Sequence, residues 1–267
     1  MRKLGWMLCL LWAGMNMQAQ MMGNLLDEVG YNARAKLVDE FFERFNGTED
    51  RPDIVRGGKD YEKKRILVLF DGKMFKSFED SLFVEAEKFA DVVNKQKVKM
   101  DYADSTWVAH AVCNGKMKGK DVKFDLYLTV EHRRENLYKW VIAKAQGEIF
   151  ELKASKVNER IMLMPDDHET NFVSLYRITH EKDNYITNYA KRGTEVDQTS
   201  VFLAYVYNGW LDIESVDELE FVFTQVQGYI FTIRDFKRDG NNSGWLINSF
   251  KKVSNKEKKE FLDFIHN

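Results

Sequence analysis

The sequence predicts an α+β protein built as two similar halves, each with helices followed by a curled, cone-like antiparallel sheet. Three observations support this prediction. Apolar residues recur at helical spacing early in each half, they alternate with polar residues later in each half, and both sets of elements follow the same order. Helices and strands are therefore segregated, which is typical of α+β proteins. The alternative prediction is a single α+β domain with one larger sheet.

The first half, residues 21–155, is expected to begin with a helix over 32–46, in which Leu37, Phe41 and Phe45 recur at helical spacing. A short apolar run then predicts a strand over 65–70, and a second helix is expected over about 76–95. After this helix the period of apolar residues changes to two. Apolar residues alternate within 98–102 and 107–113 and then over 122–130, the clearest strand, and a third strand is expected over about 137–147, so that the set forms an antiparallel meander.

The second half, residues 156–267, repeats this plan. Residues 160–164 resemble residues 65–69, and helices are expected from 165 to about 180 and over about 196–209. Three strands and a short C-terminal helix should follow. The strands are predicted over about 217–226, 229–238 and 244–253.

Residues 1–20 have the features of a secretory signal peptide. Arg2 and Lys3 precede an apolar stretch that runs from Leu4 to Gly14, and Ala19 ends the polar segment behind it. Eleven apolar residues are too few to span a bilayer, which takes about 20. We therefore expect an exported protein, periplasmic or extracellular, with no transmembrane segment.

The composition excludes several classes of protein. With 44% hydrophobic residues and only 2 prolines among 267 residues, the chain is expected to fold into a globular core. The 40 basic and 42 acidic residues nearly cancel, so the net charge gives no drive towards nucleic acid. Removal of the leader would leave Cys113 as a single cysteine, which we expect to be a buried thiol because it lies in an alternating apolar run.

Each half carries a tryptophan in its third strand, at Tyr138-Lys139-Trp140-Val141-Ile142 and at Gly244-Trp245-Leu246-Ile247. With the order of helices before strands, this resembles the nuclear transport factor 2-like, or polyketide-cyclase-like, superfamily. That resemblance implies cones of about 120 residues with a pocket between helices and sheet. The whole chain also resembles a family of exported proteins of Bacteroidetes-type bacteria, a resemblance that implies no activity.

Residues 166–169 contain the densest group of possible metal ligands, among them Asp166 and His168. A zincin helix needs a second histidine four residues after the first, and position 172 is Phe. We therefore interpret the group as a helix cap.

The loop that begins at residue 239 resembles the first half of a calcium-binding loop. Phe250 stands where that loop needs a bidentate glutamate, so a polar hairpin is predicted instead. No metal and no cofactor are expected, and no glycine-rich nucleotide loop occurs. The oxygen donors that produce the resemblance are Asp239, Asn241 and Ser243.

His110, Asp125 and Tyr127 are the weak catalytic candidates. If the turn at 115–120 is symmetrical, His110 lies opposite Tyr127, and Asp125 shares their face. Such a set suits proton abstraction beside a carbonyl group. The alternative is an ordinary solvent-facing strand surface, and Trp210 is a weak candidate for an exposed contact.

The sequence thus favours a non-catalytic binding module for a small apolar ligand or a partner protein. One alternative is a cyclase-like or isomerase-like enzyme that uses His110, Asp125 and Tyr127. Another is a structural or adhesive surface component.

Overall fold

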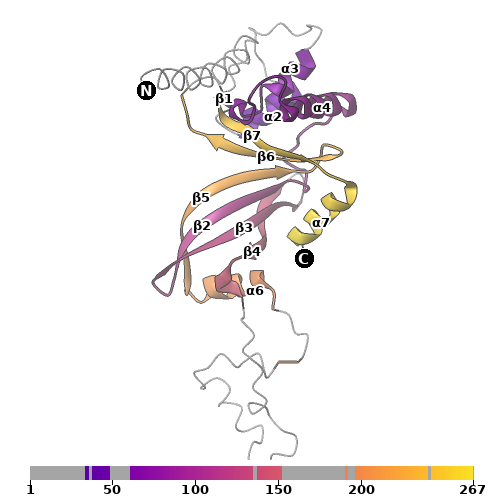
Figure 1. Cartoon of the computed structure of the whole chain (residues 1–267). Helices are drawn as coiled ribbons and strands as arrows, with labels where there is room; N and C mark the ends of the chain where they lie inside the picture. The colour runs from indigo at the N-terminus through magenta and orange to yellow at the C-terminus, as the bar shows by residue number, and fades with distance from the viewer. Residues whose placement is uncertain are drawn as a thin grey trace, which may run out of the picture. The chain divides into compact units, whose positions relative to one another are not determined.

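The computed structural model confirms the α+β class (Figure 1). Its α-helices are α2 (Val38–Asn46), α3 (Tyr61–Leu67), α4 (Ser81–Gln96), α6 (Gln198–Tyr207) and α7 (Asn255–His266). Its strands are β1 (Arg34–Ala35), β2 (Val108–Met117), β3 (Lys120–His132), β4 (Tyr138–Gln146), β5 (Leu211–Phe223), β6 (Tyr229–Phe236) and β7 (Ser243–Lys252). The residues that the structure describes are 34–35, 38–48, 61–134, 137–151, 190–191, 196–239 and 242–266.

All of these strands belong to one sheet, in the order β1-β7-β6-β5-β2-β3-β4. The short β1 runs parallel to β7, whereas β5, β6 and β7 pair in antiparallel fashion. Two similar halves with separate sheets are therefore not confirmed, and the alternative of one larger sheet fits. The two groups of strands join where β5 lies beside β2, a pairing between distant segments that local sequence patterns do not reveal.

The chain divides into two compact units. Unit 1 comprises residues 1–112, 126–143 and 217–267, and unit 2 comprises residues 113–125 and 144–216. Strands β2, β3, β4 and β5 each contribute residues to both units.

In unit 1, helices pack on both faces of the sheet, as consecutive residues at the start of β2 and in β5 show. Trp107, Phe221 and Phe223 belong to a large core with α2, α3 and α4, which lie together beside β6 and β7 in Figure 1. Val108 and Val222, one residue out of phase, pack instead with Ile265 and Phe261 of α7. The alternation of period two thus places one set of side chains under each helical layer.

Unit 2 has its own aromatic contacts around α6. Phe202 of α6 packs against Phe150 and Phe124. The centroid of its ring lies 5.7 Å from that of Phe150 and 6.0 Å from that of Phe124. The side chain of Asp197 caps the helix by accepting hydrogen bonds from the backbone N–H groups of Thr199 and Ser200. The sequence prediction of a helix over 196–209 is confirmed.

The predicted strand over 65–70 is wrong: residues 61–67 form helix α3. Arg65 to Phe70 are all buried, so the run has no polar face, and periodicity cannot separate a buried strand from a buried helix. Only its end is strand-like, because Phe70 forms an isolated parallel bridge with Ile247. The alternation over 98–102 also forms no strand.

The hairpin between β6 and β7 is tied to the turn that follows α3. The Asn242 amide donates to the Phe70 carbonyl at 2.8 Å, and its oxygen accepts from the Gly72 backbone N–H at 2.9 Å. The Arg238 guanidinium donates to Asp71 at 2.6 Å. These bonds give the polar loop a structural role that holds β7 beside residues 70–72.

The described part of the chain contains no helix that is both long and apolar enough to cross a membrane. The predicted signal peptide at residues 1–20 and the predicted helix over 165–180 lie outside the described residues.

Candidate functional site

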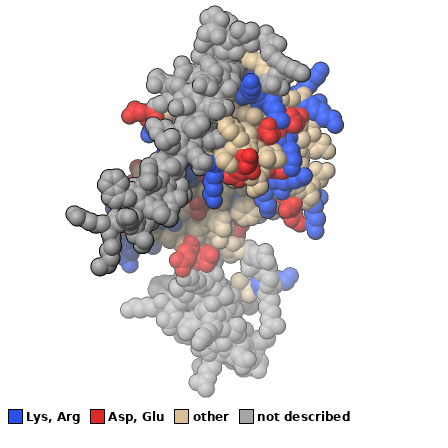
Figure 2. Space-filling view, turned by 45° about the horizontal axis from the view of Figure 1, so that its top comes forward, with Lys and Arg blue, Asp and Glu red and all other residues tan. Residues whose placement is uncertain are grey.

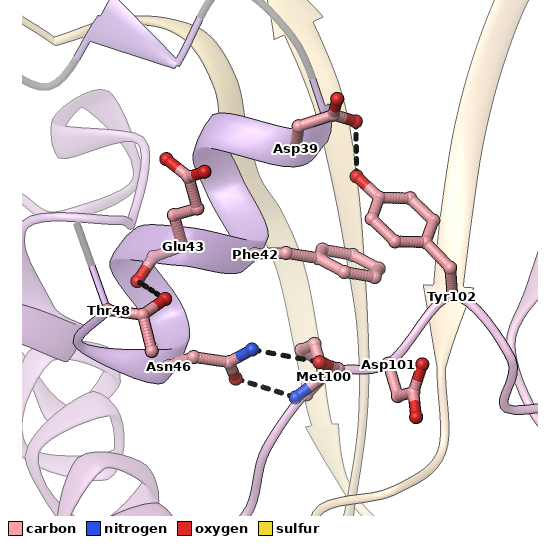
Figure 3. Close-up of a pocket in the computed structure, with 8 residues that line it drawn as sticks. All are labelled: Asp39, Phe42, Glu43, Asn46, Thr48, Met100, Asp101 and Tyr102. Atoms are coloured by element: carbon pink, nitrogen blue, oxygen red, sulfur yellow. Dashed lines mark hydrogen bonds between the residues drawn. The ribbon is translucent and has the colours of Figure 1, made fainter.

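A pocket of about 310 Å³ lies in unit 1 between helix α2 and the loop that follows α4 (Figure 3). This volume is at the small end of the range for small-molecule sites. The α2 side supplies Asp39, Phe42, Glu43, Asn46 and Thr48, and the loop supplies Met100, Asp101 and Tyr102.

Asn46 fixes the position of the loop. Its amide donates to the Met100 carbonyl at 2.8 Å and accepts from the Met100 backbone N–H at 2.7 Å, as Figure 3 shows. One helical side chain thus satisfies both polar groups of a loop residue 54 positions away. This pairing explains why residues 98–102 have no strand partner: Met100 is bonded to the end of α2 instead.

Tyr102 stands over Phe42, with ring centroids 4.4 Å apart and an interplanar angle of 26°. Phe42 is buried, whereas Tyr102 is 42% exposed, so part of the tyrosine ring faces solvent. The Tyr102 hydroxyl donates a hydrogen bond to Asp39. Burial, this hydrogen bond and the negative charges of Asp39 and Glu43 raise the pKa of Tyr102 above its usual value.

Three carboxylates belong to the pocket lining: Asp39, Glu43 and Asp101. Asp39 and Glu43 are four residues apart on α2, where like charges repel by a few tenths of a kcal/mol. Among the described residues, no ion pair joins any of the three to a basic side chain. The lining therefore combines negative charge with a partly open aromatic ring.

The charge at this pocket differs from the mixed surface visible in Figure 2, where acidic and basic side chains are interspersed. Some acidic side chains elsewhere have basic neighbours. Glu214 accepts from Lys116 at 2.7 Å, and Arg234 lies 2.7 Å from Glu218. Among the described residues, the three carboxylates of the pocket lining take part in no ion pair of this kind.

The structure brings two of the predicted catalytic residues together. The rings of His110 and Tyr127 are stacked, with centroids 4.7 Å apart and an interplanar angle of 9°. Phe264 of α7 contacts Tyr127 edge-on at 5.6 Å, and Tyr127 packs against the apolar cluster beneath α7. The predicted register is therefore correct, and the contact is part of the packing of α7.

Asp125 lies two residues before Tyr127 on β3. Neither His110 nor Tyr127 lines the pocket beside α2. A catalytic role for His110, Asp125 and Tyr127 stays a prediction.

Trp210 is 43% exposed and lies just after α6. The Lys118 ammonium stands 4.2 Å from the centre of its ring, and the Lys118 backbone N–H donates to the Trp210 carbonyl at 2.8 Å. Cys113 is 1% exposed, which confirms the predicted buried thiol.

The residues that resemble metal ligands are distributed as follows. Ser243 is buried at the start of β7 and Asp239 is exposed, whereas Asp166, His168 and Asn241 lie outside the described residues. Within the described ranges, no group of three or more His, Cys, Asp or Glu side chains could hold a metal ion.

Sequence reasoning missed the pocket beside α2 entirely. Asp39 and Glu43 fit the polar face of an amphipathic helix, and the alternation over 98–102 predicts a strand at Tyr102. The available signal was weak: two acidic residues four positions apart on one helix face.

No family model, no curated protein and no solved structure matches this chain.

Proposed function

We propose that this protein is a non-catalytic binding protein whose pocket beside α2 accepts a positively charged group, such as a lysine or arginine side chain of a partner protein. The observation that carries the proposal is the lining of three carboxylates, none paired with a basic side chain among the described residues, around a half-exposed tyrosine. Nothing in the proposal requires a bond to be made or broken.

Charge supports a cationic occupant. At about 4 Å, one carboxylate and one cation attract by about 1 kcal/mol in water and by more where solvent is partly excluded. A bound cation would also relieve the repulsion between Asp39 and Glu43. A small apolar molecule, the ligand class expected from the sequence, would gain neither effect and would desolvate three charged groups.

The aromatic pair supports the same class of ligand. Phe42 covers one side of the Tyr102 ring, and the exposed fraction of Tyr102 can receive a cation on its face. Such contacts contribute about 0.5–1 kcal/mol at exposed sites. Because Asp39 accepts the Tyr102 hydroxyl hydrogen bond, the ring is held in position before any ligand arrives.

The experiment is a calorimetric titration of the full chain with a decapeptide of alternating glycine and lysine, compared with the same peptide after acetylation of every lysine. We expect the lysine peptide to bind and the acetylated peptide not to bind. Equal binding of the two peptides would overturn the proposal, because acetylation removes the charge and retains most of the side chain.

Matched variants locate the site. Asp39→Asn should weaken binding of the lysine peptide by roughly fivefold, the equivalent of about 1 kcal/mol. Asp121→Asn removes the same charge from a side chain that is 91% exposed and lies outside the pocket, and it should change the affinity by less than about twofold. An equal loss in both variants would show that net charge, and not the pocket, attracts the peptide.

A further inference from the structure

The carboxylates that line the pocket beside α2 do not converge on one point. Asp39 lies at the hydroxyl end of Tyr102 and Asp101 lies beyond the other end of the ring, as Figure 3 shows. Within the described ranges, no three His, Cys, Asp or Glu side chains are grouped so that they could hold a metal ion. A compact charge, such as a metal ion or an ammonium group, would therefore reach only part of this lining.

Two of the carboxylates are each held in position through one oxygen. Asp39 Oδ1 accepts the hydrogen bond of the Tyr102 hydroxyl, and Asp101 Oδ1 accepts from the Ala103 backbone N–H at 2.9 Å. An ionised carboxylate can accept on both of its oxygens, so the second oxygen of each has the capacity to accept from a ligand. The pocket thus carries preorganised acceptors near both ends of the Tyr102 ring.

The Tyr102 ring is a fixed aromatic surface between these acceptors. Phe42 packs against it, with ring centroids 4.4 Å apart, and the buried Trp107 contacts it in an edge-to-face arrangement at 5.9 Å. The side chain of Tyr102 is nevertheless 42% exposed, so part of the ring is open to a ligand. An aromatic face of this kind attracts cations, and arginine occupies such positions more often than lysine.

We propose that the cationic group selected by this pocket is a guanidinium, the head group of arginine, rather than an ammonium. The inference rests on the function proposed above and names the ligand class of the same site. A guanidinium is planar, stacks on aromatic rings and carries five N–H donors that point outward in its plane. Stacked on Tyr102, it would direct donors towards both ends of the ring, where Asp39 and Asp101 lie. An ammonium has three donors on a single nitrogen and lacks this reach.

The test uses the lysine decapeptide in three forms: unmodified, acetylated on every lysine, and guanidinated on every lysine, which keeps the charge and changes the head group. In calorimetry with the full chain, the guanidinated peptide should bind about fivefold more tightly than the unmodified peptide. If the unmodified peptide binds as tightly as the guanidinated one and both bind more tightly than the acetylated one, the guanidinium inference is wrong and the proposed function stands. Equal affinities of all three forms would overturn both.

Variants at position 102 test whether the aromatic ring produces the preference. Tyr102→Leu removes the ring and should reduce the preference for the guanidinated peptide to less than about twofold. Tyr102→Phe keeps the ring and loses the hydrogen bond to Asp39, so both peptides should bind more weakly while the preference is retained. A preference that persists in Tyr102→Leu, or that disappears in Tyr102→Phe, would contradict stacking on the ring.

Tyr138→Leu is the matched control, because Tyr138 is a tyrosine of similar exposure, 41%, that also lies in unit 1 but does not line the pocket. It should leave the affinities of both peptides and their ratio unchanged. An equal loss of preference in Tyr138→Leu and Tyr102→Leu would overturn the assignment to this pocket. Thermal unfolding of each preparation shows that the variants are folded, and Tyr102→Phe decides the question if Tyr102→Leu is not.

Discussion

At the scale of single residues, hydrogen bonds between side chains that are distant in the sequence hold the elements of unit 1 together. Tyr229 is buried and donates its hydroxyl hydrogen bond to Glu85 of α4 at 2.6 Å. This hydrogen bond is the main reason why the pKa of Glu85 lies below its usual value, although burial opposes it. The contact joins the β-sheet to a helix 144 residues away.

Tyr229→Phe removes this hydrogen bond and should lower the free energy of unfolding by about 1 kcal/mol at pH 7. The expected loss is modest because solvent partly screens the Glu85 carboxylate. A carboxylate whose pKa is lower in the folded than in the unfolded protein stabilises the fold at pH values above its unfolded pKa. This stabilisation is lost as the pH falls through its folded pKa. The deficit of the variant should therefore shrink in acid. Urea unfolding at pH 7 and in mild acid measures both quantities.

Tyr207→Phe is the control for this prediction, since the Tyr207 side chain is 91% exposed. Its unfolding free energy should change by less than about 0.5 kcal/mol at either pH. A Tyr229→Phe deficit that is constant or grows on acidification would show that the tyrosine does not act through the Glu85 carboxylate.

Residues whose environment is set by their own strand could be predicted from the sequence. Cys113 is buried because it alternates with other core residues, and His110 meets Tyr127 because the β2–β3 turn fixes the register. Tyr102 could not be placed in the same way. Its partners, Phe42 and Asp39, lie about 60 positions away on α2, and no local pattern encodes that contact.

At the scale of secondary-structure elements, a single glycine allows β2 and β5 to approach each other. A β-carbon added to Gly115 would lie 2.3 Å from the backbone oxygen of Asp212, which is far inside normal contact distance. Gly115→Ala should therefore force the strands apart and cost about 2–3 kcal/mol of stability. Thermal or chemical unfolding gives the value.

Gly119→Ala provides the comparison, because an added β-carbon there has no neighbour within 4 Å. Its positive φ of 82° makes alanine strained, with an expected cost of about 1 kcal/mol. If Gly119→Ala proves the more damaging substitution, the close approach of β2 and β5 is not what requires glycine at position 115.

Asn46 links helix α2 to the loop at Met100, so its replacement tests the link between two elements. Asn46→Ala would leave a buried backbone N–H and carbonyl without their partner and should cost about 1–3 kcal/mol. The same variant should weaken binding of the lysine peptide, because Tyr102 and Asp101 would no longer be held beside α2. Unfolding and calorimetry on one preparation measure both effects. Unchanged affinity in a destabilised variant would show that the position of the loop does not determine binding at the pocket.

Most helices and strands could be predicted because each has one buried face, and the spacing of apolar residues in the sequence indicates that face. Helix α3 was missed because every residue from Arg65 to Phe70 is buried, which removes the periodic signal. The sequence also cannot reveal the partners of the buried Arg65 guanidinium, which donates to Glu62 at 2.8 Å and to the more distant Arg44 carbonyl at 2.9 Å.

At the scale of the whole molecule, the apparent repetition of helices and strands does not produce two separate sheets. The second group of strands joins the first through β5 and β2. Each group satisfies the same local rules, so the class was predicted correctly, whereas two separate sheets are not confirmed and the predicted alternative of one larger sheet fits. The pairing that decides the matter is a contact between strands about 100 residues apart, as Lys116 and Glu214 show.

Salt dependence tests whether attraction to the protein is electrostatic. The net charge of −2 is small, so long-range attraction of a cationic peptide should be modest and the pocket should supply most of the affinity. Raising the ionic strength from about 0.05 to 0.5 M shortens the screening length several-fold and should weaken binding of the lysine peptide severalfold without abolishing it. Calorimetry at several salt concentrations measures the slope, and a salt-independent affinity would contradict an ionic contact.

The central claim, that the pocket beside α2 is the binding site for a cationic group, is tested most directly by NMR mapping of backbone amides during titration with the lysine decapeptide. We predict that the largest shifts fall within residues 39–48 and 100–103. Shifts that centre instead on the acidic run from Asp212 to Glu218, or that spread evenly over acidic residues of the chain, would contradict it.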